Sequence, residues 1–351
     1  MGMQWSWQPW SDLQAEYSDN LLLIPGRSDG TETYGLNAGL RVRAQDERDT
    51  VSLLPSVQET RYAGFQSFDS NTEGLDGEWS RSSEHGKWQL GAGWVRDSTL
   101  NSELAVSGLV SFRQRALRRH LAPSFSYTLT DRTSVAVDLT YMTVHYPDAG
   151  VTGLTDYSDA NASLSWSYRW SELSTVGASL YSTRYEAARI GNRVSTYGGQ
   201  IQLTSTWTER WSSVVGAGIY TGVGEGWLLD ANLVRQDAVG QWSFALSRTV
   251  DPSGTGVLVQ QDLVSIGRQQ ALSPLWQLNM SASMLINRDL QILAPSRDRH
   301  YRSAALSISR TLAPKWKVEA GYAYDRQRYS GQSGSAERNA FSLSVHYSGN
   351  G

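Results

Sequence analysis

The chain of 351 residues contains no cysteine, so disulfides play no part in its stability. It also lacks any apolar run approaching the roughly 18 residues of a membrane-spanning helix, which excludes a helical membrane protein. Charged residues make up only 19% of the chain, below the roughly 25% of an average soluble protein. No stretch rich in Pro, Ser or charge marks a linker. We therefore expect a single domain over residues 1–351, with a short N-terminal extension at 1–10.

Sequence motifs of catalysis are missing as well. The five histidines are scattered without the spacing of metal ligands, at His85, His120, His145, His300 and His346. There is no Gly-x-Ser-x-Gly elbow, no phosphate-binding loop and no dinucleotide fingerprint. We expect a protein that is not an enzyme and that holds no metal or other cofactor. The net charge of −3 says little about partners, and we expect no nucleic acid among them.

What the chain does contain is strict alternation of apolar and polar residues. Between Ala162 and Trp170, aliphatic and aromatic residues alternate with Ser and Arg, and the stretch from Trp276 to Ile286 repeats the pattern with Gln, Asn and Ser. Successive side chains of a strand point to opposite faces. Each strand therefore has one apolar face and one polar face. The polar face is rich in Ser, Thr and Gln rather than in Lys and Glu, which suits a water-filled lumen better than the surface of a soluble sandwich.

Short polar clusters, each beside an aromatic residue, separate the alternating runs. They lie at residues 84–88, 130–133, 171–174, 208–211, 273–276 and 313–316. Longer connections rich in Gly, Asn and Asp lie between them, the longest at 100–120. Counting the runs predicts about 18 strands, the first at 13–23 and the last at 339–347. We interpret this all-β fold as a transmembrane antiparallel β-barrel with short periplasmic turns and longer extracellular loops. We expect it in the outer membrane of a bacterial cell.

Aromatic residues at the strand ends support this interpretation. Six tryptophans lie beside short turns and would form the periplasmic girdle: Trp88, Trp207, Trp211, Trp242, Trp276 and Trp316. Five tyrosines lie towards the long connections and would form the outer girdle: Tyr141, Tyr181, Tyr185, Tyr220 and Tyr324. Residues 1–5 lack the basic start and apolar core of an export leader. We expect the leader to have been removed and Met1 and Gly2 to be additions; the alternative is a cytosolic protein.

The connection at 100–120 holds five basic residues close together: Arg113, Arg115, Arg118, Arg119 and His120. A loop of this length can fold into a barrel and narrow its pore, where its charges would meet an acidic or phosphate-bearing solute. The alternative is a solvated loop that binds the phosphates of outer-leaflet lipids.

Polar positions within the strands form the second group of candidate residues. Those predicted to line the lumen are Asp138, Ser163, Ser165, Arg169, Gln202, Thr204, Asp230, Gln277, Asn279, Lys317 and Glu319. Arg235 and Asp325 belong to the same charged set. Lumen-facing residues tune the selectivity of a barrel. The charged ones could instead form cross-strand pairs that stiffen the wall.

Three short motifs carry a resemblance to a known family. They are Ala-Glu-Tyr-Ser-Asp-Asn at 15–20, Asp-Ser-Thr-Leu-Asn-Ser-Glu-Leu at 97–104, and Ala-Pro-Ser-Phe-Ser-Tyr-Thr-Leu-Thr at 122–130 with the nearby segment 141–146. Together they resemble outer-membrane barrels encoded in bacterial exopolysaccharide gene clusters of the PEP-CTERM/exosortase type. The resemblance covers mainly the first 150 residues. It implies a role in moving a surface polysaccharide across the outer membrane.

The leading expectation is therefore an outer-membrane pore that exports a surface or extracellular polysaccharide as part of a larger secretion system. Its partners would be outer-membrane lipids, the polysaccharide and a periplasmic export protein. One alternative is a diffusion porin for small sugars or anions. Another is a soluble all-β carbohydrate-binding protein, which would not need detergent to remain in solution.

Overall fold

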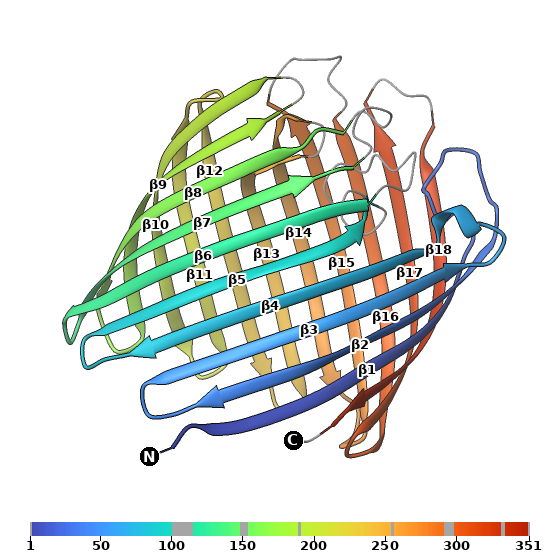
Figure 1. Ribbon diagram of the computed structural model, residues 1–351, viewed down its shortest axis with the longest axis horizontal. Helices are drawn as coiled ribbons and strands as arrows, with labels where there is room; N and C mark the ends of the chain where they lie inside the picture. Colours follow the sequence, from blue (N-terminus) through green and yellow to red (C-terminus); the bar gives the residue numbers. More distant parts are fainter. Residues whose placement is uncertain are drawn as a thin grey trace.

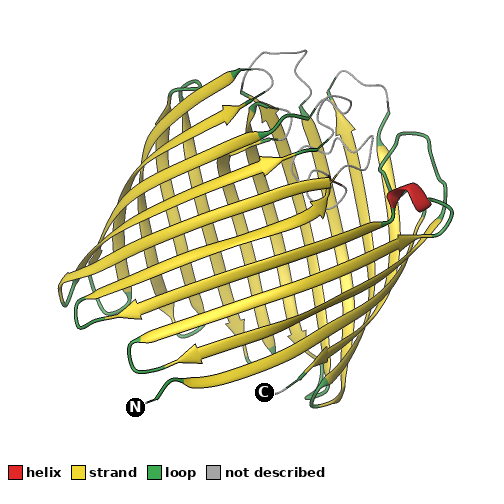
Figure 2. Ribbon diagram, in the orientation of Figure 1, coloured by secondary structure: helices red, strands yellow, loops and turns green. Residues whose placement is uncertain are grey.

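The computed structural model describes residues 2–99, 115–147, 154–188, 191–253, 256–290, 298–330 and 334–349. Almost all of this part of the chain is β-strand (Figure 2), apart from turns and a short 3-10 helix, η1 (Gln66–Phe68). Within these ranges no helix is long and apolar enough to cross a membrane.

Eighteen antiparallel strands follow one another along the chain. The first nine are β1 (Gln4–Ser18), β2 (Thr31–Gln45), β3 (Asp49–Tyr62), β4 (Ser70–Ser82), β5 (Gly86–Ser98), β6 (Arg115–Thr130), β7 (Thr133–His145), β8 (Tyr157–Arg169) and β9 (Ser174–Ala187). The others are β10 (Asn192–Thr208), β11 (Trp211–Thr221), β12 (Gly226–Asp237), β13 (Gly240–Pro252), β14 (Leu258–Ala271), β15 (Trp276–Asp289), β16 (Arg299–Ala313), β17 (Trp316–Tyr329) and β18 (Ala336–Ser348).

The strands close into a barrel (Figure 1). Each strand pairs with its neighbours in sequence, and β1 pairs with both β2 and β18. The joint between β1 and β18 runs from Trp10 opposite Ser348 to Ser18 opposite Ala340. Closure satisfies the backbone donors and acceptors of both terminal strands, which removes the open edges that a sheet would otherwise expose. The structure confirms the predicted transmembrane barrel and its number of strands.

The two ends of the barrel differ in the length of their connections. The chain termini lie at one end, with turns of two to four residues, and the connections at the other end have four residues or more (Figure 1). Polar side chains stabilise the short turns. Asp46 Oδ1 accepts hydrogen bonds from the backbone N–H groups of Arg48 and Asp49 at 2.8 and 2.7 Å, and Ser273 Oγ accepts one from Trp276 N at 3.2 Å. This local bonding explains why polar clusters beside an aromatic mark the turns.

The strand register separates an apolar outer face from a polar inner face. Leu164 pairs with Val137 and Leu180, so all three share one face, and Leu164 is 53% exposed in the isolated chain. Such exposure of large apolar side chains on a closed barrel indicates contact with lipid. The six tryptophans beside the short turns all lie on this face: Trp88, Trp207, Trp211, Trp242, Trp276 and Trp316.

The prediction for the other girdle is wrong for three of its five tyrosines. Tyr181 pairs with Ser163, and Tyr220 pairs with Gly198, which places both on the inner face. Tyr185 lies four residues beyond Tyr181 on the same strand and therefore also faces inward. Tyrosine fits either face of a strand end, because it has an apolar ring and a polar tip.

The N-terminal boundary also differs from the prediction. Residues 4–10 belong to β1 rather than to an extension, and Trp5 on the outer face is 71% exposed. Residues 19–23, predicted as strand, form part of the connection to β2. The side chain of Asn20 turns the chain there, because its Oδ1 accepts from Ile24 N at 3.0 Å and its Nδ2 donates to Ile24 O at 2.9 Å.

Candidate functional site in the barrel lumen

The register places all eleven side chains predicted to line the lumen on the inner face. They are Asp138, Ser163, Ser165, Arg169, Gln202, Thr204, Asp230, Gln277, Asn279, Lys317 and Glu319. They come from six strands around the wall, so they do not gather into one site. Lys317 Nζ lies 3.0 Å from Glu319 Oε2, which neutralises that pair. Their role in selectivity stays a prediction.

The predicted basic loop is largely part of the barrel wall. Arg115, Arg118, Arg119 and His120 all belong to β6, because the alternation of this strand continues to Arg115. Arg118 and His120 face inward, whereas Arg115 and Arg119 face outward. Arg113 lies outside the described residues. These four residues therefore do not form a constriction loop; the two outward arginines lie where the lipid-phosphate alternative would need them.

Arg235 also differs from its predicted place. It pairs with Trp211 and Trp242, so it lies on the outer face, and its guanidinium lies 5.3 Å from the centre of the Trp211 ring. A cation over a tryptophan near the short turns fits a membrane interface.

A charged recess of about 790 Å³ lies on the inner wall between β2 and β6. Its cations are Arg41, Arg43 and Lys87, its carboxylates are Asp76 and Glu78, and the imidazole of His120 also lines it. His120 Nε2 lies 3.7 Å from Asp76 Oδ1. The other members of the recess are not among the predicted site residues, although alternation along β2, β4 and β5 places them on the polar face.

Small residues make room for the recess. Gly93 on β5 lies between Asp76 on β4 and His120 on β6, and a Cβ at this position would collide with both side chains. Glycine therefore lets a carboxylate and an imidazole meet across an intervening strand. Gly91, which also lines the recess, adds no side chain to that part of the wall.

Three cations of the recess are free to act on a solute. No ion pair is formed in the described part of the chain by Arg41, Arg43 or Lys87. Other inward groups are paired: His346 on β18, for example, pairs with Asp12 on β1. A cation that faces a lumen without a partner attracts anions, because the low-dielectric wall focuses its field into the water. The recess is thus the strongest described candidate for a solute-recruiting surface.

The extracellular half of the inner wall contains a buried polar network. Asp325 is 1% exposed and accepts hydrogen bonds from Tyr301 Oη at 2.5 Å and from Arg338 Nε at 2.8 Å. Arg299 Nε donates to Gln327 Oε1 at 2.7 Å. These bonds join β16, β17 and β18 side by side, so the network stiffens the wall. This supports the structural alternative for Asp325 rather than a role in contacting solute.

An apolar cluster lies inside the barrel at the long-loop end. Its buried members are Ala116, Val144, Tyr146, Leu154, Tyr157, Tyr185, Ala187 and Leu258. Most come from the inner face of β6 to β9 and the adjoining connection, but Leu258 comes from β14. The cluster therefore joins two parts of the wall that are not neighbours in the sheet, and it occupies space within that end of the barrel.

Two hydrogen bonds hold the connection between β13 and β14 over this cluster. Tyr185 Oη donates to Ser253 O at 2.9 Å, and Asn192 Nδ2 donates to Gly256 O at 2.9 Å. Gly256 has a φ of +92°, a conformation that favours glycine. Sequence alternation carries no signal for such contacts, because they join segments that are far apart in the sheet.

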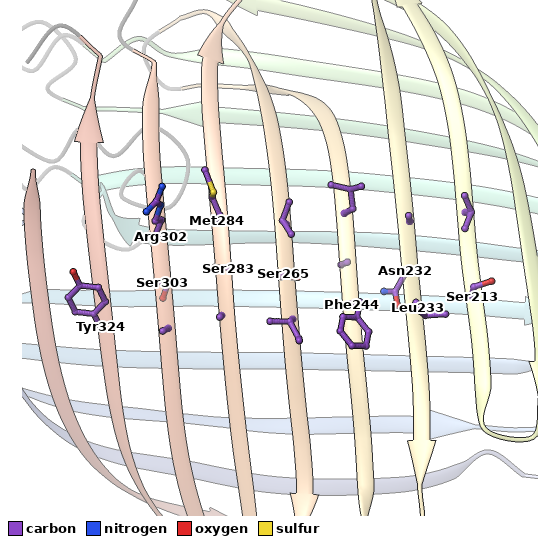
Figure 3. Close-up of a pocket in the computed structure, with 18 of the residues that line it drawn as sticks. Ser213, Asn232, Leu233, Phe244, Ser265, Ser283, Met284, Arg302, Ser303 and Tyr324 are labelled. Carbon is purple, nitrogen blue, oxygen red and sulfur yellow. The ribbon is translucent and has the colours of Figure 1, made fainter.

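A further hollow, of about 810 Å³, lies on the outer wall over β11 to β17 (Figure 3). Small residues such as Ala282 and Ala304 line it, together with the larger side chains of Phe244, Met284 and Tyr324 (Figure 3). Its lining is almost entirely apolar and belongs mainly to the lipid-facing side of the strands. The hollow is therefore no part of the aqueous path.

In the described part of the chain, no group of three or more His, Asp or Glu side chains could hold a metal ion.

The barrel resembles solved bacterial outer-membrane channels. Pseudomonas aeruginosa OccK2 (OpdF) has a TM-score of 0.59 and 11% identity, covering 100% of this chain and 99% of that one. The chain has the fold of an outer-membrane porin. Pseudomonas aeruginosa OpdQ has a TM-score of 0.56 and 11% identity, covering 99% of both chains. Acinetobacter baumannii OccAB3 has a TM-score of 0.53 and 9% identity, covering 99% of this chain and 100% of that one.

One of these barrels has a solved complex. OccK2 has been crystallised with glucuronate, and that structure has a TM-score of 0.58 and 11% identity, with 100% of both chains covered. No protein-family model matches the present chain. No curated protein matches its sequence either. At identities of 9–11%, the similarity shows that the fold is shared and shows nothing further.

Proposed function

We propose that this protein is a passive diffusion channel of the bacterial outer membrane for small polar and charged solutes. The observation that carries the proposal is the set of three unpaired cations, Arg41, Arg43 and Lys87, on the inner wall of a closed barrel whose outer face is apolar. Eighteen strands close the barrel, and a barrel of this size encloses a water-filled path.

The inner wall has the chemistry that passage requires. A solute must be attracted strongly enough to enter and weakly enough to leave. The unpaired cations attract acids, while the amides and hydroxyls along β8, β10 and β15 exchange hydrogen bonds with water at little cost. The glucuronate bound by OccK2 is a small acidic sugar, and acids of that size are the first solutes to test here.

Export of a polysaccharide stays a competing hypothesis. An extended polymer needs a bore that is open at both ends, and the apolar cluster around Tyr157 and Tyr185 occupies part of the long-loop end. Small solutes can pass beside such a cluster more easily than a chain that must remain continuous. The fold also supports the diffusion channel, because it matches the outer-membrane barrels OccK2 and OpdQ over nearly their whole length.

The test is permeation by the purified protein. We expect stable conductance in planar bilayers, and faster swelling of loaded liposomes with glucuronate than with uncharged glucose. Replacing Arg41, Arg43 and Lys87 by Ser should reduce the glucuronate-to-glucose ratio by about threefold to tenfold, because the attracting field is lost. The matched control is the triple exchange Arg41→Lys, Arg43→Lys, Lys87→Arg, which keeps the three positive charges of the recess and should keep the ratio.

Two results would contradict the proposal. The first is absence of conductance from correctly folded wild-type barrels. The second is a deletion strain that loses surface polysaccharide while it takes up small acids normally, which would favour the polymer pore and a periplasmic export partner.

A further inference from the structure

A second cavity in the lumen has the opposite charge. It measures about 320 Å³ and lies at the long-loop half of the barrel, where β8, β9 and β10 face β12, β13 and β14. Asp159, Asp230 and Asp251 contribute three carboxylates to its lining, and Tyr181, Thr196 and Gln200 contribute polar groups. Strands separated in sequence therefore bring their acidic residues to one place.

The lining offers no cation to neutralise these carboxylates. Its sole described cation, Arg248, donates from Nε and Nη2 to the two oxygens of Asp262 at 2.5 and 2.8 Å. The same guanidinium lies 3.7 Å from the centre of the Trp227 ring, on the outer face. Asp230 has no hydrogen bond or ion pair in the described chain, and Asp251 accepts one bond from Thr249 Oγ1 at 2.6 Å.

Two buried acceptors at this cavity lack donors. Thr196 is 4% exposed, and its Oγ1 has no hydrogen-bond partner among the described residues. Asp159 Oδ1 is likewise buried and unpartnered there. A buried polar atom without a partner is destabilising, so native proteins rarely keep one unless something else fills the need. An ionised carboxylate only accepts hydrogen bonds and a hydroxyl oxygen can accept them too, so a ligand that supplies several donors suits both groups.

The size and spacing of these groups define the class of ligand. The described carboxylates do not converge into a group that could hold a metal ion. A cavity of about 320 Å³ is at the small end of the range for organic ligands. A primary ammonium group supplies three donors and a positive charge, and the ring of Tyr181 can contact a cation or its alkyl chain.

We propose that this cavity binds a small organic cation carrying one or more ammonium groups as it enters from the long-loop side. The inference deepens the proposed channel function and rests on it for its physiological meaning, since the site would select amines along the diffusion path. Binding itself does not require conduction. The ammonium donates to Asp159 and Thr196, while Asp230 and Asp251 balance the charge at a second amine.

The primary test is binding of 1,4-diaminobutane to the detergent-solubilised barrel by isothermal titration calorimetry, with 1,4-butanediol as the uncharged analogue. We expect saturable binding of the diamine and none of the diol. The double variant Asp159→Asn, Asp230→Asn should bind the diamine at least about tenfold more weakly, because two charge-assisted bonds are lost. Asp138→Asn is the matched control: it removes an inward carboxylate that does not line the cavity.

Folding of each variant is checked by circular dichroism and by heat-dependent mobility in gels. Equal affinity for diamine in the wild type and the double variant would overturn the site, as would an equal loss in the Asp138→Asn control. Planar bilayers then separate the two proposals. Diamine binding without any channel conductance would leave the site standing and refute the diffusion channel, whereas conductance without saturable diamine binding would refute the site alone.

Discussion

The hydroxyl of Tyr185 provides a sensitive test of how the long-loop end is held. Tyr185→Phe keeps the ring and its contact with Tyr157, whose centre lies 5.5 Å away, and removes the hydroxyl that donates to Ser253 O. Loss of a buried hydrogen bond of this kind costs about 1–3 kcal/mol. That range corresponds to roughly a fivefold to 150-fold increase in the fraction of time for which the β13–β14 connection is released.

The assay is hydrogen exchange measured on peptides that cover Val257 and Leu258, with single-channel conductance as the functional readout. In Tyr185→Phe, exchange should accelerate within the range above, and the open conductance should rise because Leu258 of the apolar cluster is held less firmly at that end of the barrel. Asn192→Ala removes the second anchor and should add to the effect. Tyr141→Phe is the control, because Tyr141 lies on the exposed outer face.

Unchanged exchange and conductance in the double variant Tyr185→Phe, Asn192→Ala would refute this reasoning. The apolar cluster alone would then hold the connection, and the two hydrogen bonds would be incidental to the width of the mouth.

Three further predictions follow from the wall of the barrel. Leu164→Arg should cost about 2–4 kcal/mol of folding free energy into lipid vesicles, because the side chain faces the bilayer, whereas Ser165→Arg should be tolerated at the lumen; equal costs would mean that the register is shifted. Asp325→Asn should destabilise the barrel to urea by about 3 kcal/mol, because it leaves the half-buried Arg338 without its charged partner; a normal unfolding curve would count against the buried network. The two backbone N–H groups bound by Asp46 lower the pKa of its carboxyl group. Its contribution to the free energy of unfolding is therefore present above the unfolded pKa and is lost as pH falls through the lower folded pKa. Asp46→Asn should flatten this acid dependence in unfolding measurements, and an unaltered pH profile would contradict it.

The sequence predicted the barrel because the relevant physics is local. Alternation depends on neighbouring residues, and the turns depend on side chains such as Ser273 that bind backbone groups two or three residues away. The same alternation was sufficient to assign Ser165 and Asn279 to the inner face. The predicted boundaries are wrong at two strand ends, because β1 begins at Gln4 and β6 begins at Arg115, both before the positions at which the alternating runs predict them.

The recess and the apolar cluster could not be predicted in the same way. Which cations remain unpaired depends on distances across strands. Glycine is needed at Gly93 because a side chain there would collide with Asp76 and His120 on the neighbouring strands, and a sequence pattern does not show that contact. The hydrogen bond between Tyr185 and Ser253 joins β9 to the residue after β13, a strand that is not adjacent to β9 in the sheet. A periodic pattern records which face a residue occupies, but it contains no information about what lies opposite.

The pairing of β1 with β18 also has a kinetic consequence. Seventeen joints of the barrel link strands that a connection already keeps close together, whereas this joint links Ser18 to Ala340 across nearly the entire chain. Closing so long a loop carries the largest entropic cost and has no local nucleus to reduce it. Hairpins can therefore form early and independently, whereas closure of the barrel requires β1 and β18 to meet. Pairing of these two strands is the slow step that turns a set of hairpins into a closed barrel.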